Sequence, residues 1–253
     1  MVWRLWGQGD PLVLLHGGAG SWLHWLPTIE AFRTRRLVVA ADLPGLGGSD
    51  LLGAAADGGA SVVAAGLDSL LGHHEAIDLV GFSFGGVIAG LVASRRPATR
   101  SLTLVGSGGL GVITGTARLE RDRDTVGAVR VAAHRANLHR WMIDDPARID
   151  AGAIAIQDWN SRHARLDSRP IGTSDILASA LPRVRCPVAG IWGAHDQSVQ
   201  GETARPRDVI RAAHPGAAFH VVPDAGHWVA YEAPQAFNAI LDGVLQATEQ
   251  VPV

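Results

Sequence analysis

The sequence of 253 residues contains no lysine, a single cysteine and a single tyrosine. All 22 of its basic residues are arginines, scattered along a chain whose net charge is −2, so the charge pattern does not predict binding to nucleic acid. The lone Cys186 excludes an internal disulfide and is typical of a reducing compartment. Because it stands before Pro187 at the start of an apolar run, we expect it to pack in the core rather than to act in catalysis.

Long apolar runs and metal-binding motifs are also missing from the sequence. No apolar stretch approaches the roughly 18 residues of a membrane-spanning helix, and residues 1–6 lack the basic start and long apolar centre of a signal peptide. The cluster His73-His74-Glu75 lacks the i,i+4 histidine pair of a helical zinc site. We therefore expect a cytoplasmic protein that does not enter a membrane and uses neither a metal nor another cofactor.

What the chain does contain is an alternation of strand-like and helix-like segments. Helix-like segments occupy residues 26–32, 62–71, 86–93 and 234–246, and apolar runs typical of buried strands occupy residues 12–16, 37–42, 76–80, 101–106, 187–192 and 218–222. This alternation predicts an α/β fold, in which helices cover both faces of a mostly parallel, doubly wound sheet.

The alternation is interrupted in the middle of the chain. Between about residues 110 and 181 no buried strand is predicted, and polar, arginine-rich, helix-like stretches carry Trp141 and Trp159. The simplest interpretation is a core made of residues 1–109 and 183–253, with residues 110–182 inserted as a helical cap, or lid, over the carboxyl edge of the sheet.

The most informative motif is Gly-Phe-Ser-Phe-Gly at residues 81–85. It follows a strand-like run and precedes a helix-like run rich in small residues, which is the context of a nucleophile elbow. Such a turn is so tight that side chains at Gly81 and Gly85 would collide with neighbouring backbone. The sequence therefore predicts Ser83 as a nucleophile, held in a strained conformation beside the positive end of a helix.

A serine hydroxyl needs a base to remove its proton, and an imidazole base needs a carboxylate to fix its tautomer. We expect the base to be His227, which follows Gly226 in the loop after the last strand-like run. We expect the acid to be Asp196, just past the preceding strand-like run, in the chain order that this fold uses. Asp224 is the rival acid, although its position is more typical of a turn residue.

Attack on a carbonyl creates a negative oxygen that needs preorganised backbone N–H donors. One predicted donor is Phe84, directly after the nucleophile. The other lies in the glycine-rich turn that follows the first buried strand, where Gly18 is the first choice and Ala19 the second. In the same turn His16 is expected to be a buried histidine that orders the backbone, and Asp42 is expected to hydrogen-bond loops rather than to act chemically.

Together these residues resemble the α/β-hydrolase superfamily over about residues 9–245. The resemblance rests on four motifs in the expected order: His16-Gly17-Gly18, the Asp-Leu-Pro-Gly run at residues 42–45, Gly81-x-Ser83-x-Gly85, and Gly226-His227-Trp228. It implies a serine hydrolase fold and a Ser-His-Asp triad, but not a particular substrate. It also weakly favours a homodimer.

A finer resemblance, to meta-cleavage-product hydrolases that split carbon–carbon bonds in aromatic catabolism, rests on residues 105–111 and on Asn-Ser-Arg at residues 160–162. It implies that Arg162 pairs with a substrate carboxylate and that Trp228 lines the pocket. The chain departs from that family by carrying Phe82 instead of a polar asparagine before the nucleophile, and by a shorter glycine loop. Both departures make the pocket less polar and favour an ester or a modified ketone.

The expected function is hydrolysis of a small carbonyl substrate by Ser83, as a carboxylesterase or as a carbon–carbon hydrolase. Aromatic side chains near loops or in the insertion are expected to line the substrate site, and besides Phe82 and Trp228 these are Trp141 and Trp159. Epoxide hydrolases and haloalkane dehalogenases are disfavoured, because they carry aspartate at the elbow, whereas a haloperoxidase-like side reaction stays open. The alternative outside catalysis is a ligand receptor built on the same scaffold.

Overall fold

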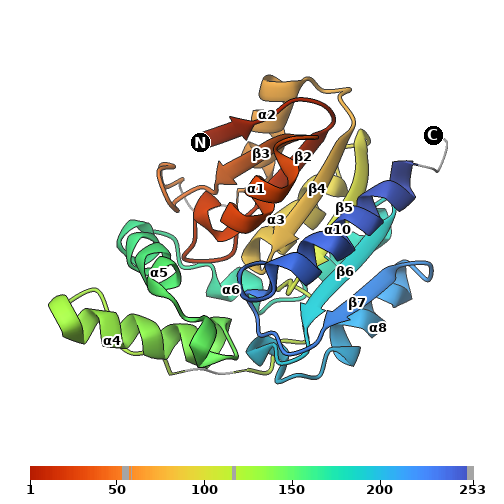
Figure 1. The fold of residues 1–253 in the computed structure, drawn as a ribbon. Helices are drawn as coiled ribbons and strands as arrows, with labels where there is room; N and C mark the ends of the chain where they lie inside the picture. The colour runs from red at the N-terminus through yellow and green to blue at the C-terminus, as the bar shows by residue number, and fades with distance from the viewer. Residues whose placement is uncertain (53–56, 58, 116–117, 250–253) are drawn as a thin grey trace.

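The computed structural model describes residues 1–52, 57, 59–115 and 118–249. Within these residues, seven strands form one sheet in the order β1-β3-β2-β4-β5-β6-β7 (Figure 1). The strands are β1 (Val2–Trp6), β2 (Pro11–Leu15), β3 (Leu37–Asp42), β4 (Ile77–Phe82), β5 (Thr99–Val105), β6 (Val188–Gly193) and β7 (Ala218–Val222). β1 pairs antiparallel with β3, and every other neighbouring pair is parallel. This is the mostly parallel α/β architecture that the alternation predicts.

Helices cover both faces of the sheet. In the core they are α1 (Leu26–Phe32), α2 (Ala60–Leu71), α3 (Phe84–Ala93), α8 (Ala204–Ala213), α9 (Val229–Glu232) and α10 (Pro234–Glu249), with the 3₁₀ turns η1 (Trp22–Trp25) and η5 (Gln197–Val199). Side chains of α2, α3 and α8 pack into one apolar cluster, and those of η1, α1, α9 and α10 pack into a second. In Figure 1, α1 and α10 lie in front of the sheet and α8 lies behind it.

The strand β2 shows why the sequence folds into this layered core. Val13 and Leu15 belong to the first cluster, whereas Leu12 and Leu14 belong to the second. Successive side chains of a strand point to opposite faces, so an unbroken apolar run can be buried on both sides only in the middle of a covered sheet. All five residues of β2 are buried accordingly.

Between β5 and β6 the chain leaves the sheet. The described part of this insertion contains α4 (Gly127–Asn137), α5 (Ala151–His163), α6 (Arg169–Gly172), α7 (Ile176–Ala180), the π turn η2 (Leu138–Met142) and the 3₁₀ turns η3 (Pro146–Arg148) and η4 (Leu181–Arg183). No strand occurs in its described residues. Figure 1 shows α4 and α5 standing to one side, apart from the helices that cover the sheet. Among the described residues, no helix is both long and apolar enough to cross a membrane.

A partly buried ionic cluster joins α4 to α5. The Arg130 guanidinium contacts the Asp158 carboxylate, and His134 Nε2 lies 3.0 Å from the same carboxylate. Partial burial acts to raise the pKa of Asp158, but hydrogen bonds from Arg130, Arg162 and His134 together outweigh it and lower this pKa to about 2. Helix α4 therefore turns polar side chains inward toward α5, which explains why this segment looks polar in sequence and yet forms defined structure.

Candidate active site

Ser83 occupies the sharp turn between β4 and α3. Its backbone has φ 53° and ψ −116°, a conformation that non-glycine residues rarely adopt. A Cβ added at Gly81 would lie 2.4 Å from the Gly85 carbonyl oxygen, and one added at Gly85 would lie 2.3 Å from the Leu15 carbonyl oxygen. Both glycines are thus required by close backbone contact, and the turn presents Ser83 at the carboxyl end of β4.

His227 and Asp196 lie beside Ser83, although they are far apart in sequence. β4, β6 and β7 run in the same direction, so the loops that follow them meet at one edge of the sheet. His227 Nε2 is 3.0 Å from Ser83 Oγ, and His227 Nδ1 is 2.9 Å from each carboxylate oxygen of Asp196. With Nδ1–H donating to the carboxylate, the lone pair of Nε2 faces the serine hydroxyl.

The inner part of this cluster is shielded from solvent. His227 is 3% exposed and Asp196 is 0% exposed, while Ser83 is half-buried. Asp196 also accepts a hydrogen bond of 2.8 Å from the Ser198 backbone N–H. The rival acid Asp224 is exposed in the turn after β7, at φ 52°. The geometry therefore pairs His227 with Asp196.

Gly106 belongs to the run at residues 105–111 that carries the finer resemblance, but the sequence predicted no role for it at this site. A Cβ at this position would lie 3.1 Å from His227 Nδ1 and 3.2 Å from Asp196 Oδ2, and its φ of 50° also disfavours a side chain. It directly follows β5, the strand between β4 and β6 in the sheet. Its position at the carboxyl end of that strand was the signal that could have identified it.

The glycine-rich turn after β2 lies against the nucleophile. A Cβ at Gly17 would be 3.2 Å from Ser83 Cβ, and one at Gly18 would be 3.7 Å from Phe84 Cβ. Ala19 has a positive φ of 46°. Phe84 is the first residue of α3, so its backbone N–H has no partner within the helix. The predicted donors Gly18 and Phe84 are thus brought together on one side of Ser83.

Two buried histidines support this turn. His16 Nδ1–H donates to the Gly17 carbonyl at 2.7 Å, and its Nε2 accepts from the Leu43 backbone N–H at 2.9 Å. Burial lowers the pKa of His16 to about 4, so the ring is neutral at ordinary pH. This agrees with the ordering role expected for it. Asp42 accepts hydrogen bonds from the Trp22 and Gly48 backbones, also as expected.

His24, the second of these histidines, was not predicted. Burial, and then repulsion by His16 and His227, lowers the pKa of its imidazole well below the usual value. Its ring packs against Gly20, where a Cβ would come within 2.3 Å of His24 Cε1. Its Nδ1 has no hydrogen-bond partner among the described residues. Nothing in the sequence distinguishes it from the other histidines.

Aromatic rings flank the imidazole of His227. The Phe82 ring centroid lies 4.9 Å from that of His227, and the Trp141 ring centroid lies 6.0 Å from it. These two predicted substrate-site residues are therefore adjacent to the cluster. Trp159 is half-buried and stacks on His163 instead, at a centroid distance of 4.0 Å.

The other two predicted substrate contacts lie in different surroundings. Trp228 is 1% exposed, donates from Nε1 to the His24 carbonyl at 2.9 Å, and belongs to the second apolar cluster. The Arg162 side chain is 58% exposed and pairs with Asp158 on the same helix at 2.9 Å. The first has the environment of a core residue and the second that of a solvated arginine, so neither supports a substrate contact.

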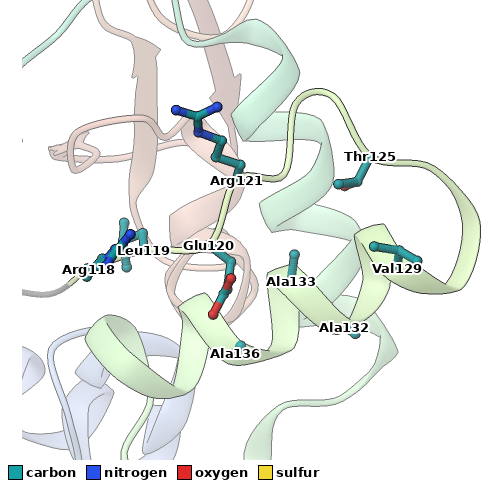
Figure 2. A pocket seen from close by; sticks show the side chains of 9 residues that line it. All are labelled: Arg118, Leu119, Glu120, Arg121, Thr125, Val129, Ala132, Ala133 and Ala136. Atoms are coloured by element: carbon teal, nitrogen blue, oxygen red, sulfur yellow. The ribbon is translucent and has the colours of Figure 1, made fainter.

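A separate hollow lies within the insertion. Its volume is about 650 Å³. Figure 2 shows its lining side chains on the chain at residues 118–125 and on helix α4. Leu119 and Glu120 line one wall, and Val129 and Ala136 line the other. Ser83, Asp196 and His227 are not among its lining residues, so it is distinct from the cluster at the sheet edge.

A parallel sheet with a strained serine after its central strand, and a histidine and an acid after two later strands, is the arrangement of α/β hydrolases. The model of the Alpha/beta hydrolase family matches residues 12–240, and the chain belongs to this family.

The proteins that this chain resembles include enzymes named for different activities. The chain is 30% identical over 250 residues to a dihydrolipoyllysine-residue acetyltransferase component of an acetoin cleaving system from Pseudomonas putida; the match covers 91% of this chain but only 62% of that protein. It is 28% identical over 258 residues to a 2-hydroxy-6-oxo-2,4-heptadienoate hydrolase of Pseudomonas putida, covering 96% and 91%. An esterase structure from Rhodococcus sp. ECU1013 has a TM-score of 0.79 at 22% identity, covering 97% and 94%.

Proposed function

We propose that this chain is a serine hydrolase that cleaves a small carboxylic ester through an acyl-enzyme. The observation that carries the proposal is the continuous series of contacts from Ser83 Oγ to His227 Nε2, at 3.0 Å, and from His227 Nδ1 to Asp196, at 2.9 Å. Membership of the α/β-hydrolase family supports the same chemistry. We assign Ser83 as nucleophile, His227 as base and then acid, and Asp196 as the group that orients His227.

In the first half of the reaction, His227 Nε2 takes the proton of Ser83 while Oγ bonds to the substrate carbonyl carbon. The buried Asp196 stabilises the imidazolium that forms, because it faces Nδ1–H in a region without solvent. The tetrahedral intermediate then expels the alcohol, which leaves with the proton from Nε2. An acyl group remains on Ser83.

In the second half, His227 removes a proton from water, and the resulting nucleophile attacks the acyl carbon. Collapse of the second tetrahedral intermediate releases the carboxylic acid and returns the proton to Ser83 Oγ. In both halves we assign the backbone N–H groups of Gly18 and Phe84 to the negative oxygen; their closeness to Ser83 supports this assignment. Ala19 is the alternative donor.

The surroundings of the site favour an ester over a carboxylate-bearing dienone. A dienone hydrolase needs a group that binds the carboxylate, and Arg162 is exposed and paired with Asp158. Phe82 beside His227 makes this wall apolar. Carbon–carbon cleavage is the second candidate, because the chain is similar over 96% of its length to a 2-hydroxy-6-oxo-2,4-heptadienoate hydrolase. In that reaction the dienol would become a ketone before the same nucleophile acts.

We also propose that residues 110–182 form a cap over this site. Contacts between Trp228 N–H and the Met142 carbonyl, at 2.7 Å, and between Trp141 and His227 support the proposal. Within the predicted core and cap, residues 53–56, 58, 116–117 and 250–253 lie outside the described part of the chain. A homodimer and a cytoplasmic location stay predictions from the sequence.

The test compares kcat/KM for a short p-nitrophenyl ester and for a 2-hydroxy-6-oxo-dienoate, using wild type and Ser83→Ala. We expect the ester to be preferred and Ser83→Ala to lose at least about 10³-fold in kcat/KM, since the covalent route requires the hydroxyl. Ser94→Ala is the matched control, because Ser94 follows the other end of α3 and its hydroxyl donates to the Leu91 carbonyl at 2.8 Å. It should retain wild-type turnover.

Other outcomes would change the assignment. Wild-type turnover in Ser83→Ala would contradict the nucleophile. Preference for the dienoate by several orders of magnitude would select carbon–carbon cleavage. A single slow turnover of every substrate, with tight product binding, would instead favour the ligand receptor.

A further inference from the structure

The Ser168 side chain of the insertion lies against the glycine-rich turn. A Cβ added at Gly18 would lie 2.1 Å from Ser168 Oγ and 3.3 Å from Ser168 Cβ. A side chain at position 18 would therefore force the hydroxyl of Ser168 to move away. Since Gly18 is an assigned donor to the oxyanion, this hydroxyl sits beside the place where negative charge would develop.

The same position also adjoins the second assigned donor. The Cβ site of Gly18 lies 3.7 Å from Phe84 Cβ, and the Cβ site of the preceding Gly17 lies 3.2 Å from Ser83 Cβ. The Ser168 hydroxyl, the turn and the first residue of α3 thus converge next to the nucleophile. No other side-chain hydroxyl meets Gly18 in this way among the described residues.

The Ser168 hydroxyl is available to donate. It makes no hydrogen bond to a described residue, and although Ser168 precedes α6 its side chain does not cap that helix. Ser168 is half-buried, so water can replace the missing hydrogen bond of its hydroxyl only in part. A serine hydroxyl rotates freely about its C–O bond, so its proton can be directed toward an oxygen that enters beside Gly18.

The backbone around Ser168 is fixed to the core on both sides. Before it, the Arg165 backbone N–H donates to the Gly45 carbonyl at 2.9 Å. After it, the Gly172 N–H donates to the Ser168 carbonyl at 2.9 Å, and the Gly109 N–H donates to the Gly172 carbonyl at 2.7 Å. The hydroxyl therefore approaches the turn from a defined backbone position.

A second contact fixes the same part of the insertion to the turn. Ser21 Oγ, at the end of the glycine-rich turn, donates to Asn160 Oδ1 of α5 at 2.6 Å, and both residues are fully buried. Because a preorganised donor costs no rearrangement during the reaction, such anchoring is what a charge-stabilising group needs.

We infer that Ser168 is a catalytic residue that donates a third hydrogen bond, from its Oγ–H, to the oxyanion held by Gly18 and Phe84. This inference rests on the proposed function. The hydroxyl keeps its proton throughout, so no covalent bond changes at Ser168. The insertion then serves the chemistry directly, since it supplies one of the three donors.

The test measures kcat and KM for the p-nitrophenyl ester in Ser168→Ala and Ser168→Thr. We expect Ser168→Ala to lower kcat by about 10-fold to 100-fold, at the low end of the effect of removing an oxyanion donor, with KM changed less than about threefold. Ser168→Thr keeps the hydroxyl and should recover most of kcat. Ser168→Gly is the second variant, in case alanine disturbs folding.

Ser174→Ala is the matched control. Ser174 lies in the same insertion; its hydroxyl donates to the Ile171 carbonyl at 2.7 Å and accepts from the Ile176 N–H at 3.3 Å, and among the described residues it makes no hydrogen bond to the glycine-rich turn. We expect its kcat to equal that of wild type. A purely structural role for Ser168 would lower Tm together with kcat, whereas loss of a donor lowers kcat and the affinity for a tetrahedral phosphonate at unchanged Tm.

The two proposals fail in different ways. If Ser83→Ala is inactive but Ser168→Ala and Ser168→Gly keep wild-type kcat, only the role of Ser168 is overturned. Equal loss in Ser168→Thr and Ser168→Ala would also overturn it, because the hydroxyl would then not be the cause. If Ser83→Ala retains full activity, the proposed function itself is wrong and the role of Ser168 is rejected with it.

Discussion

His16 connects two loops at the site through its two ring nitrogens. One nitrogen donates to Gly17 in the glycine-rich turn, and the other accepts from Leu43 after β3. Both bonds require the neutral ring with its proton on Nδ1. Protonation would turn the acceptor nitrogen into a donor that faces the Leu43 N–H, in a place where water cannot compensate the charge.

This arrangement makes stability depend on pH in a defined direction. The pKa of His16 is about 4 in the folded chain, against 6.5 when the ring is solvated. Between those values the unfolded state binds the proton and the folded state does not. The contribution of His16 to the free energy of unfolding is therefore complete above pH 6.5. It falls by on the order of 3 kcal/mol as the pH is lowered toward 4.

The prediction is tested by urea unfolding of wild type and His16→Gln between pH 7.5 and 4.5. Glutamine can accept the Leu43 hydrogen bond but does not titrate, so we expect a shallower decline in unfolding free energy as the pH is lowered. The control His73→Gln removes an exposed histidine paired with Asp68, and its pH profile should follow wild type. Identical slopes in wild type and His16→Gln would contradict the buried neutral ring.

At the level of elements, the elbow depends on how closely α3 approaches β2. Gly85, in the first turn of α3, contacts the Leu15 and His16 carbonyls at the end of β2, where a Cβ would lie 2.3 and 2.4 Å from their oxygens. Backbone at that distance cannot move aside as a flexible side chain would. The helix can begin beside the strand only because this residue is glycine.

Alanine substitutions at two helical glycines should therefore have opposite effects. Gly85→Ala should lower the free energy of unfolding by at least about 2 kcal/mol, through overpacking. Gly243→Ala, in the exposed face of α10 where no atom lies within 4 Å, should raise it by roughly 0.5–1 kcal/mol, through helix propensity. Chemical denaturation of both variants measures these changes in the free energy of unfolding. A Gly85→Ala protein as stable as wild type would contradict the close contact between α3 and β2.

Most of the core elements could be predicted from the sequence because their side chains are buried on both faces. The strand predicted at residues 37–42 is β3, and the helix predicted at residues 26–32 is α1, because the spacing of apolar residues indicates both elements. β1 was missed. It is an edge strand whose half-exposed residues pair antiparallel with β3, so its pattern lacks the continuous apolar run of a buried strand.

At the level of the whole molecule, predictability depended on whether a residue's position follows from a strand. Ser83, Asp196 and His227 each come after a parallel strand, so topology alone puts them at one edge. Arg162 and Trp228 were predicted by resemblance, and their orientation depends on how α5 and the second apolar cluster pack. Ser168 was not predicted, because only the folded insertion brings it to Gly18.

The most direct measurement is covalent trapping with a fluorophosphonate, followed by mass spectrometry of the digested protein. We expect one adduct per chain, on the peptide that contains Ser83, with loss of ester hydrolysis in proportion to labelling. His227→Ala should react far more slowly, because Ser83 would keep its proton. An adduct on another serine that accompanies inactivation, or continued turnover by fully labelled protein, would contradict the assignment of Ser83 as nucleophile.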